Sequence, residues 1–236
     1  MISVCMATYN GEKYIQQQIE SILCQLGKED EIVVSDDGSK DGTVQFLKSF
    51  QDSRIKIIRN EGKNGFVGNF ENALSHANGD VIFLADQDDV WKPDKVKVVL
   101  KALQDADLVV HDAELINAGG ISQGKNYYSF LHNSQGFWMN LLKTRFLGCC
   151  MAFNRRVLQD CLPFPKRIVG HDYWIGMYAL TKYRVCFIPD ILISYRRHGE
   201  NASPSAEKSN ESLCYKIIRK RLYMLLALIQ RWFSAF

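Results

Sequence analysis

The sequence predicts an α/β fold, in which a mainly parallel sheet is covered by helices on both faces. Two observations support this: short apolar runs alternate with segments of helical periodicity through the first half, and three of the runs end in loops rich in Asp or Asn. The 236 residues suffice for one large domain, and 47% of them are hydrophobic. That apolar content excludes a mainly disordered chain.

Each predicted strand of the first half is a short apolar run that stops at a polar turn. We expect strands at residues 2–7, 31–35, 54–59, 81–85 and from 108 onward. Apolar residues spaced every three to four positions predict helices at 12–26, between Asp41 and Phe50, at 66–77 and from Pro93 onward. Asp41 is expected to cap the second helix, and Pro93 to lie in the first turn of the fourth.

The second half of the chain is less regular. Its composition predicts strands at 146–153, 184–188 and 191–196, a short helix around Val157 and a longer one at 172–181. Residues 117–136 are rich in Gly, Ser and Asn and predict a mobile loop. No linker-like segment interrupts residues 1–212, so we predict one domain followed by a helical tail at 213–236.

Charge and the missing motifs exclude several classes of function. The formal charge is +3, and the last 24 residues hold five basic and no acidic side chains, so the remainder carries −2. This balance argues against a general nucleic-acid-binding surface. The chain lacks GxGxxG, GxxxxGK[ST] and GxSxG patterns, which argues against a Rossmann dehydrogenase, a P-loop enzyme and an α/β-hydrolase.

Cysteine usage and the N-terminal residues predict a cytoplasmic location. The seven cysteines form no CxxC pair, which gives no support to a zinc ribbon or a thioredoxin-type site and favours a reducing compartment. The first ten residues contain no basic region and lead directly into a predicted strand, so we expect no signal peptide. No apolar run reaches the roughly 18 residues of a membrane span.

Three of the predicted loops should converge on one site. In open α/β sheets the ligand crevice lies at the carboxyl ends of strands, where residues 8–12, 36–41 and 86–89 are expected. Carboxylates at 86–89 can hold Mg²⁺ or Mn²⁺ and leave coordination positions for diphosphate oxygens. The same acidic residues are also suited to capping the helix that follows.

Other polar motifs each allow a structural and a functional interpretation. The segment 37–42 resembles the start of an EF-hand loop, but Lys48 occupies the position of the bidentate Glu, which excludes calcium. It is either a turn with a cap, or a source of carboxylates for a nucleobase or ribose. Asp172 opens a predicted helix as a cap or as a general base, and His198 is either structural or a metal ligand.

Taken in order, these motifs resemble glycosyltransferase family 2, a family of inverting enzymes with the GT-A fold. The matching segments are ATYNGE at 7–12, SDDGSKDGT at 35–43, NG at 64–65, Asn69, ADQDDVW at 85–91, GCCMAF at 148–153, HDYW at 171–174 and YRRH at 195–198. They span roughly residues 1–200. The DQDDVW, HDYW and YRRH segments are most similar to the bacterial rhamnosyltransferase-like branch, which builds cell-surface polysaccharides.

The resemblance implies a role for individual residues. Asp37 would hold the pyrimidine, Asp86 would face the ribose or sugar, and Asp88 would bind the divalent metal with help from His198. Asp172 would be the general base, although many members carry Glu-Asp where this chain has His-Asp. The donor-binding residues implied are Ala7, Thr8, Tyr9, Glu12, Asp37, Asn64, Asp86, Gln87 and Asp88.

The implied function is an inverting, metal-dependent hexosyltransferase with a GT-A fold: a Rossmann-like, mostly parallel sheet flanked by helices. Residues 1–110 would be the nucleotide-binding half and 111–212 the acceptor-binding half of one domain, with Mn²⁺ or Mg²⁺ as cofactor. The donor would be dTDP-rhamnose or a UDP-sugar, and the acceptor a glycan or lipid-linked saccharide. The metal would neutralise the leaving diphosphate while a carboxylate deprotonates the acceptor, so one displacement inverts the anomeric centre.

Two other functions compete with this one. A non-catalytic nucleotide-sugar or metal-binding module would keep Asp37 and Asp88 but would have no need of Asp172 and His198. A nucleotidyltransferase would require a Gly-rich, basic loop near the N-terminus, and residues 7–14 contain only one glycine and one lysine. Turnover of a sugar donor with Mn²⁺ separates the enzyme from the binding module.

The tail at 213–236 predicts a basic amphipathic helix, because it contains no Pro or Gly and places five cations beside an aromatic-rich apolar stretch. Such a helix can lie in a membrane interface with Lys and Arg on anionic headgroups. That would place the protein at the inner face of the plasma membrane. The alternatives are packing on its own domain or on a second copy of the chain, forming a homodimer.

Overall fold

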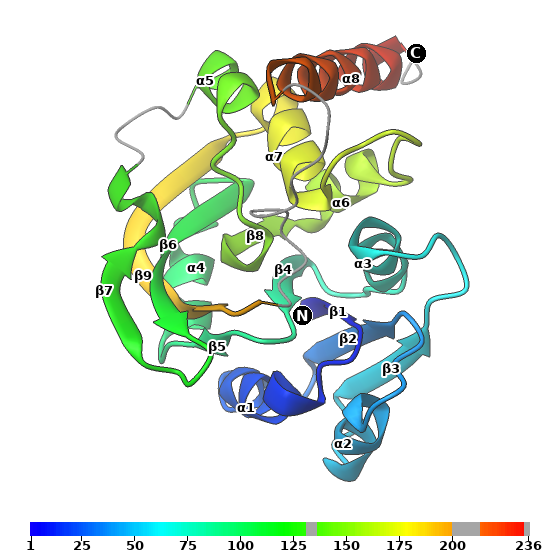
Figure 1. Ribbon diagram of the computed structural model, residues 1–236, viewed down its shortest axis with the longest axis vertical. Helices are drawn as coiled ribbons and strands as arrows, with labels where there is room; N and C mark the ends of the chain where they lie inside the picture. The colour runs from blue at the N-terminus through cyan, green and yellow to red at the C-terminus, as the bar shows by residue number, and fades with distance from the viewer. Residues whose placement is uncertain (131–135, 200–212, 234–236) are drawn as a thin grey trace.

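The computed structural model describes residues 1–130, 136–199 and 213–233 (Figure 1). Its first half alternates strands and helices in the order that the apolar runs predict. These elements are β1 (Ile2–Thr8), α1 (Glu12–Leu23), β2 (Glu31–Asp36), α2 (Thr43–Ser49), β3 (Ile55–Arg59), α3 (Phe66–Ser75) and β4 (Val81–Asp86). The strands β1 and β2 are almost wholly buried, which explains why they are continuous apolar runs rather than alternating ones.

The second half adds shorter and more varied elements. They are β5 (Val90–Trp91), α4 (Lys95–Ala102), β6 (Leu108–Asn117), β7 (Ser122–Asn126), the 3₁₀ helix η1 (Tyr127–Phe130), α5 (Phe137–Leu142), the 3₁₀ helix η2 (Gly148–Cys150), β8 (Met151–Asn154), α6 (Arg155–Cys161), α7 (His171–Lys182), β9 (Val185–Arg197) and α8 (Leu213–Phe233). The predicted α/β fold with a C-terminal helix is confirmed by this arrangement.

One sheet connects both halves, in the order β3-β2-β1-β4-β8-β6-β9-β5, with β7 paired to β6. The pairings among β1, β2, β3 and β4 are parallel, whereas β8 joins β4 and β6 antiparallel. The chain runs outward from β1 to β3 and then returns to β4 on the other side of β1. This reversal creates a switch point between β1 and β4, where open α/β sheets bind ligands.

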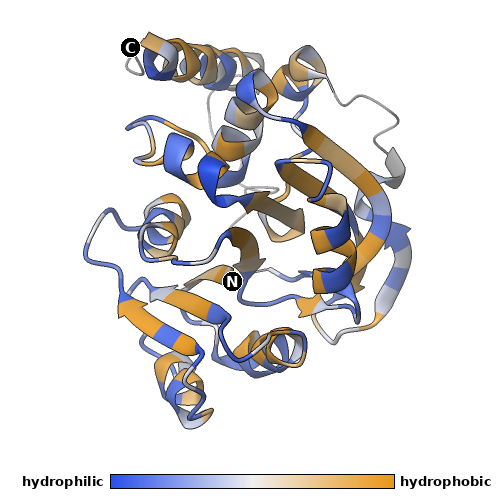
Figure 2. Cartoon of the chain, turned by 180° about the vertical axis from the view of Figure 1, so that it is seen from behind, coloured by the Kyte–Doolittle hydropathy of each residue, from blue (hydrophilic) through white to orange (hydrophobic). Residues whose placement is uncertain are grey.

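Helices cover both faces of the sheet, as Figure 1 shows for α1 and α2 on one side of β1–β3 and α3 on the other. Right-handed crossovers require this split, because the chain reverses direction across the sheet after β3. In Figure 2 hydrophobic residues are concentrated along the central strands, while β7 at the edge is mostly hydrophilic. The core extends across both halves, from Val4 and Ile32 to Trp174 and Ile193.

Several predicted boundaries were wrong. The helix expected at 12–26 ends at Leu23, and the fourth helix begins at Lys95, two residues after Pro93. Asp41 lies just before the N-cap Gly42, although its carboxylate accepts a hydrogen bond from the Thr43 N–H at 3.0 Å. In each case local hydrogen bonding ends or starts the helix within a turn of the expected residue.

Larger differences occur in the second half. The loop expected at 117–136 contains β7 and η1, because backbone pairing with the edge of β6 stabilises a strand whose composition is polar; residues 131–135 lie outside the described part. The strands expected at 184–188 and 191–196 are one strand, β9, which bends through register shifts against β6. Of the strand expected at 146–153, only residues 151–153 belong to a strand, because Gly148–Cys150 form η2 and β8 begins at Met151.

The helix α8 packs on the domain that precedes it. Met224, Ala227 and Leu228 are buried, and two arginines fix the helix through backbone carbonyls. Arg221 Nε donates to Leu141 O at 2.8 Å, and Arg231 donates to Leu162 O at 3.1 Å. None of the helices in the described part of the chain has the length and apolarity of a membrane-spanning helix.

A buried carboxylate ties the first three strands together. Glu31 accepts hydrogen bonds from Ser3 Oγ at 2.5 Å, from Lys56 Nζ at 2.5 Å and from the Asn78 N–H at 2.6 Å. Burial opposes ionisation of Glu31, but the bonds from Lys56, Ser3 and Asn78 outweigh it and hold its pKa below the usual value. A depressed folded-state pKa stabilises the fold above the unfolded pKa, and this stability is lost as pH falls through the folded value.

Replacing Glu31 with glutamine should therefore lower the free energy of unfolding by about 1–3 kcal/mol at pH 7. The difference from the wild type should shrink as pH falls below the unfolded-state pKa of about 4.3 and on through the lower folded-state pKa. Urea denaturation at several pH values measures both effects. Glu29→Gln, at an exposed position, is the matched control. A Glu31→Gln variant as stable as this control at pH 7 would contradict the role assigned to Glu31.

Candidate active site

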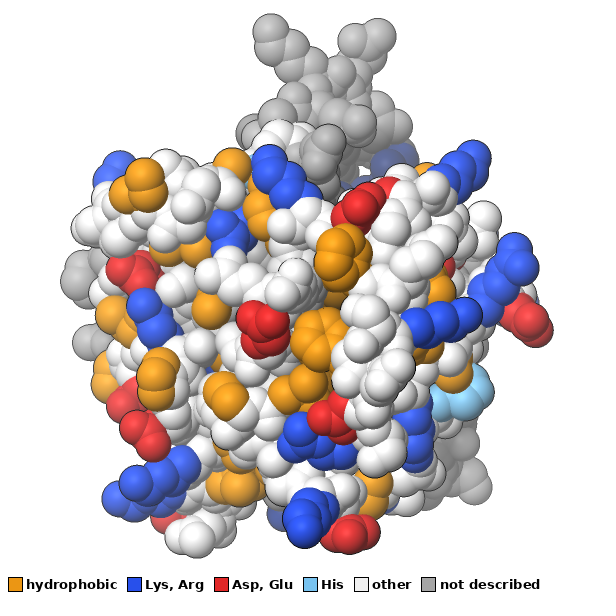
Figure 3. All heavy atoms as spheres, turned by 90° about the horizontal axis from the view of Figure 1, so that it is seen from below, with side chains coloured by type: hydrophobic (Ala, Val, Ile, Leu, Met, Phe, Trp, Pro, Cys, Tyr) orange, Lys and Arg blue, Asp and Glu red, His pale blue; other side chains and the backbone are white. Residues whose placement is uncertain are grey.

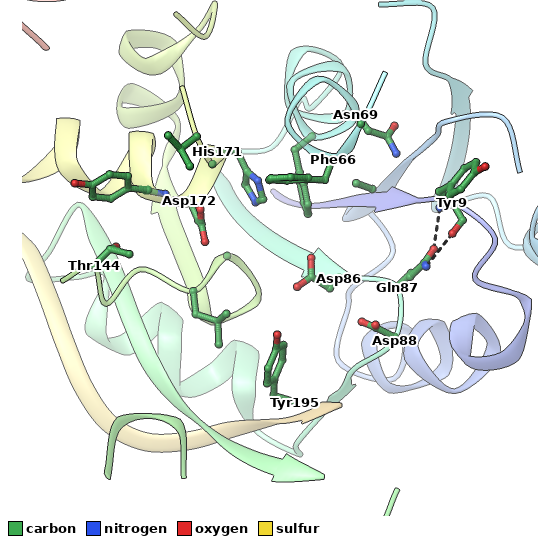
Figure 4. A pocket seen from close by; sticks show the side chains of 18 of the residues that line it. Tyr9, Phe66, Asn69, Asp86, Gln87, Asp88, Thr144, His171, Asp172 and Tyr195 are labelled. Atoms are coloured by element: carbon green, nitrogen blue, oxygen red, sulfur yellow. Dashed lines mark hydrogen bonds between the residues drawn. The ribbon is translucent and has the colours of Figure 1, made fainter. Parts of the chain in front are cut away.

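The three strand-end loops meet at one cavity of about 690 Å³. The register places Thr8 beside Asp36 and Ala7 beside Asp86, so the chain segments that follow β1, β2 and β4 leave the sheet at the same edge. Figure 4 shows side chains from these loops facing others from α3 and α7 across the cavity. The convergence expected from the sequence is therefore present, at the switch point of the sheet.

The two aspartates at the end of β2 have different surroundings. Asp36 accepts hydrogen bonds from Thr8 Oγ1 and from the backbone of Gly38 and Ser39, so its carboxylate shapes the turn. Asp37 lines the cavity, where Oδ1 accepts from Asn60 Nδ2 and Oδ2 from the Gly65 N–H, both at 2.7 Å. Gly65 has a φ of +93°, a conformation that a residue with a Cβ rarely adopts.

A reciprocal pair of hydrogen bonds links the loop after β1 to the loop after β4. The Tyr9 N–H donates to Gln87 Oε1 at 2.9 Å, and Gln87 Nε2 donates to Tyr9 O at 3.1 Å (Figure 4). On the other side of β1, Asn69 Nδ2 donates to Thr8 O at 3.0 Å. Ala7, Thr8, Tyr9 and Gln87 line the cavity, and the bonds of Thr8, Tyr9 and Gln87 hold this part of the wall in place.

Carboxylates crowd the end of β4. Burial, followed by the charges of Asp89, Asp88 and Asp172, raises the pKa of Asp86 well above its usual value. Burial, followed by the charge of Asp88, raises the pKa of Asp89 to about 7. Ligand atoms of Asp86, Asp89 and Cys149 also lie within 4.8 Å of one another. Mutual repulsion of this kind is relieved by a bound cation, so the cluster is electrostatically suited to one.

Asp88 and His198 form a pair that fits a divalent metal. The Nε2 atom of His198 lies 2.7 Å from Asp88 Oδ2, although the two residues are 110 positions apart in the chain. A carboxylate oxygen and an imidazole nitrogen together suit Mn²⁺ and other first-row ions. Asp88 faces the main cavity, while His198 lines a neighbouring cavity that also contains Tyr9 and Gln87. The structure thus brings the two predicted metal ligands together.

Arg196 explains how the end of β9 reaches Asp88. This arginine is buried, its Nε donates to Asp88 O at 2.7 Å, and its backbone N–H donates to Asp89 Oδ1 at 2.9 Å. The guanidinium group also lies 4.8 Å from the centre of the Tyr14 ring. These contacts fix the loop after β4 against β9, two residues before His198. Nothing local in the YRRH segment indicates this role of Arg196.

Asp172 approaches the cavity from the side opposite to β2, in the first turn of α7. Its Oδ1 atom accepts from the Tyr173 N–H at 2.7 Å. A Cβ at Gly170 would come within 2.6 Å of that oxygen, so glycine leaves the room that the carboxylate occupies. The neighbouring His171 is buried and stacks on Phe70 with ring centres 3.8 Å apart. Figure 4 shows Asp86 lying between Asp88 and Asp172.

Two predicted donor-binding residues lie apart from this group. Glu12 is exposed, accepts a hydrogen bond from the Gly42 N–H at 2.8 Å and lines the neighbouring cavity rather than the main one. Asn64 is exposed, and it is the adjacent Gly65 that lines the main cavity. Both assignments stay predictions.

The sequence did not predict all the side chains that line the cavity. Those not predicted come from α3, from the segment 141–147, from β9 and from α8, and include Phe66, Phe70, Leu141, Thr144, Leu147, Tyr195, Lys220 and Arg221. Most are apolar residues at helical or strand spacing, a pattern that also describes an ordinary core. The basic tail gave a signal, but its charge alone indicated an anionic partner rather than a position at the cavity.

Comparisons with known proteins are consistent with this geometry. The family model described as "Glycosyl transferase family 2" matches residues 3–162. The chain is 29% identical over 213 residues to the Escherichia coli UDP-Glc:alpha-D-GlcNAc-diphosphoundecaprenol beta-1,3-glucosyltransferase WfgD, covering 89% of this chain and 82% of that protein. It is 29% identical over 219 residues to the Shigella flexneri dTDP-rhamnosyl transferase RfbG, covering 83% of this chain and 72% of that protein.

The fold also resembles a solved structure. S. aureus TarS, residues 1–349, in complex with UDP-GlcNAc superposes with a TM-score of 0.72 at 22% identity. The match covers 95% of this chain and 66% of that one. At this identity the likeness shows the fold alone.

Proposed function

The chain belongs to glycosyl transferase family 2, and on that premise we propose that it transfers a sugar from a UDP-sugar or dTDP-rhamnose to a glycan or lipid-linked saccharide. One observation carries the proposal: Asp37, Asp88 and Asp172, from three separate elements, line a single cavity. These are the residues expected to bind the base, the metal and the acceptor proton. We place the reaction in cell-surface polysaccharide synthesis at the cytoplasmic face of the plasma membrane.

The donor nucleotide would lie against the ends of β1 and β2. Asp37 already accepts two hydrogen bonds, and a carboxylate has about four lone-pair positions, so it retains capacity for the imide N–H of a pyrimidine. Uracil and thymine present that same edge, which is why UDP and dTDP donors remain equivalent at this position. Asp86 lies between Asp88 and Asp172 and would bond the ribose or the sugar.

Asp88 and His198 would hold Mn²⁺ or Mg²⁺. When bound there, the metal supplies positive charge for the departing diphosphate. The contacts of Arg196 with the loop after β4 hold Asp88 beside His198. Their carboxylate oxygen and imidazole nitrogen form an incomplete donor set, which leaves coordination positions for diphosphate oxygens.

Asp172 would accept the acceptor proton. The acceptor hydroxyl gives its proton to the carboxylate while the hydroxyl oxygen bonds to the anomeric carbon. The bond between that carbon and the diphosphate oxygen breaks in the same displacement. Attack from the face opposite to the leaving group inverts the anomeric configuration. A single displacement of this kind requires no covalent enzyme intermediate.

A donor screen tests the proposal. We expect UDP- or dTDP-sugars, with Mn²⁺, to raise the melting temperature and to be turned over, and GDP- and ADP-sugars to do neither. Asp37→Asn should weaken donor binding by about tenfold or more, since it removes a charged hydrogen-bond acceptor. Asp105→Asn, at an exposed position, is the control. Equal stabilisation by purine and pyrimidine donors would contradict the role of Asp37.

A further inference from the structure

Exposed apolar side chains gather on α5 and α8. Among the described residues, fifteen large hydrophobic side chains are exposed, and nine of them belong to these two helices. Trp138 is 70% exposed on α5, and Phe233 is 80% exposed on α8. Single exposed hydrophobic residues are ordinary, whereas a concentration on neighbouring elements marks an interaction surface.

The spacing of these residues along α8 places them on one stripe. Ile218, Leu222, Leu226, Ile229 and Phe233 follow each other by four, four, three and four positions, which keeps them on one side of a helix. Met224, Ala227 and Leu228 occupy a different side and are buried against the domain. The helix is thus anchored by one face and presents a second apolar face outward.

The helix α5 extends this surface. Arg221 Nε donates to Leu141 O at 2.8 Å, which joins α8 to the end of α5, and Figure 1 shows the two helices next to each other. Trp138, Met139 and Leu142 are the exposed apolar residues of α5. We call these three residues and the α8 stripe, together with Trp232, the α5–α8 face.

The two segments that form this face carry charge of one sign. Residues 136–145 and 213–233 contain seven Lys and Arg and no Asp or Glu. Of these, Lys143, Arg219 and Lys220 are exposed. The face seen from below in Figure 3 is different, because acidic and basic side chains are interspersed over it. A symmetric pairing of two α5–α8 faces would bring like charges together, which disfavours a second copy as the occupant.

The α5–α8 face adjoins the mouth of the cavity. Leu142 is on α5 and Lys220 is on α8, and both side chains line the cavity that also contains Asp172. A surface that covers the face would therefore lie next to the acceptor side of the site. At the interface of an anionic bilayer, apolar side chains enter the boundary of the acyl chains and cations contact the headgroups. The α5–α8 face has both kinds of side chain.

We propose that the α5–α8 face docks on an anionic membrane surface and so presents the cavity to a saccharide carried on a membrane lipid. The choice of a lipid-carried acceptor rests on the proposed function, whereas the docking itself does not depend on catalysis. Lying in the interface, the stripe of α8 and Trp138 enter the headgroup region, while Lys143 and Arg219 contact anionic headgroups and Lys220 stays at the mouth of the cavity.

Vesicle sedimentation of the full chain tests the docking. Vesicles of phosphatidylcholine with a quarter phosphatidylglycerol should bind the protein at low salt, and vesicles of phosphatidylcholine alone should bind it at least about tenfold more weakly. The double variant Leu222→Glu/Leu226→Glu should lose binding by a similar factor. Ile121→Glu is the matched control, since it charges an exposed isoleucine outside the face, and it should bind as the wild type does.

Donor-induced thermal stabilisation, measured on the same proteins, separates this inference from the proposed function and shows that the variants are folded. Equal vesicle binding by the wild type and the double variant, or none by either, overturns the docking while leaving the enzymatic proposal intact. No response to any sugar donor with normal vesicle binding overturns the enzymatic proposal instead. A wild-type dimer that the double variant dissociates, without vesicle binding, assigns the face to a second copy.

Discussion

Replacing Asp88 with asparagine is expected to reduce sugar transfer by about a thousandfold or more. The side chain of Asp88 is buried, borders the cavity and contacts His198 at 2.7 Å, so the amide would keep the shape of the site and remove its charge. Without that carboxylate the divalent metal would bind too weakly to neutralise the charge that develops on the leaving diphosphate in the transition state. The measurement is kcat across a Mn²⁺ series carried to saturation.

Asp94→Asn provides the comparison for this variant. Asp94 is exposed and has a φ of +65°, a conformation that asparagine tolerates well, so the change should leave both fold and turnover unchanged. Calorimetry with Mn²⁺ alone adds a readout that does not depend on activity, and binding to Asp88→Asn should be weakened. Near-normal turnover of Asp88→Asn at saturating Mn²⁺ would remove Asp88 from the metal site.

Replacing Asp172 with asparagine is expected to reduce transfer by about 10²–10⁴-fold while donor affinity stays close to that of the wild type. The reason is its position. Asp172 enters the cavity from α7, whereas the predicted donor residues lie on the other side: Thr8 ends β1, and Asp37 and Asp88 follow β2 and β4. An amide at 172 can still accept from the Tyr173 N–H, so local structure should persist. The measurements are kcat and the donor dissociation constant.

Asp190→Asn, at an exposed position on β9, should change neither quantity. If the Asp172→Asn variant loses donor affinity in proportion to turnover, Asp172 belongs to the donor side and another group must accept the proton. If its melting temperature falls sharply without donor, the carboxylate has a structural role in the first turn of α7 instead.

The donor half of the site could be predicted because its signals are local. A strand buried on both faces is a continuous apolar run, and the polar residues that follow it leave the sheet at the carboxyl end. The sequence therefore predicts that Thr8, Asp37 and Asp88 lie at one edge of the sheet, and in the structure all three line one cavity. In this half the ends of the helices were misplaced, because capping depends on individual hydrogen bonds, and Glu12 and Asn64 lie outside the main cavity.

The sequence by itself determined the α/β class, the order of the first strands and the acidic residues at their ends, since each depends on periodicity within a few neighbouring residues. The tertiary structure alone decided that Arg196 fixes His198 against Asp88, that polar β7 is a strand, and that α8 borders the cavity. These features arise from contacts across up to about 110 positions. Such contacts depend on backbone pairing and helix packing, which leave no periodic pattern in the residues that make them.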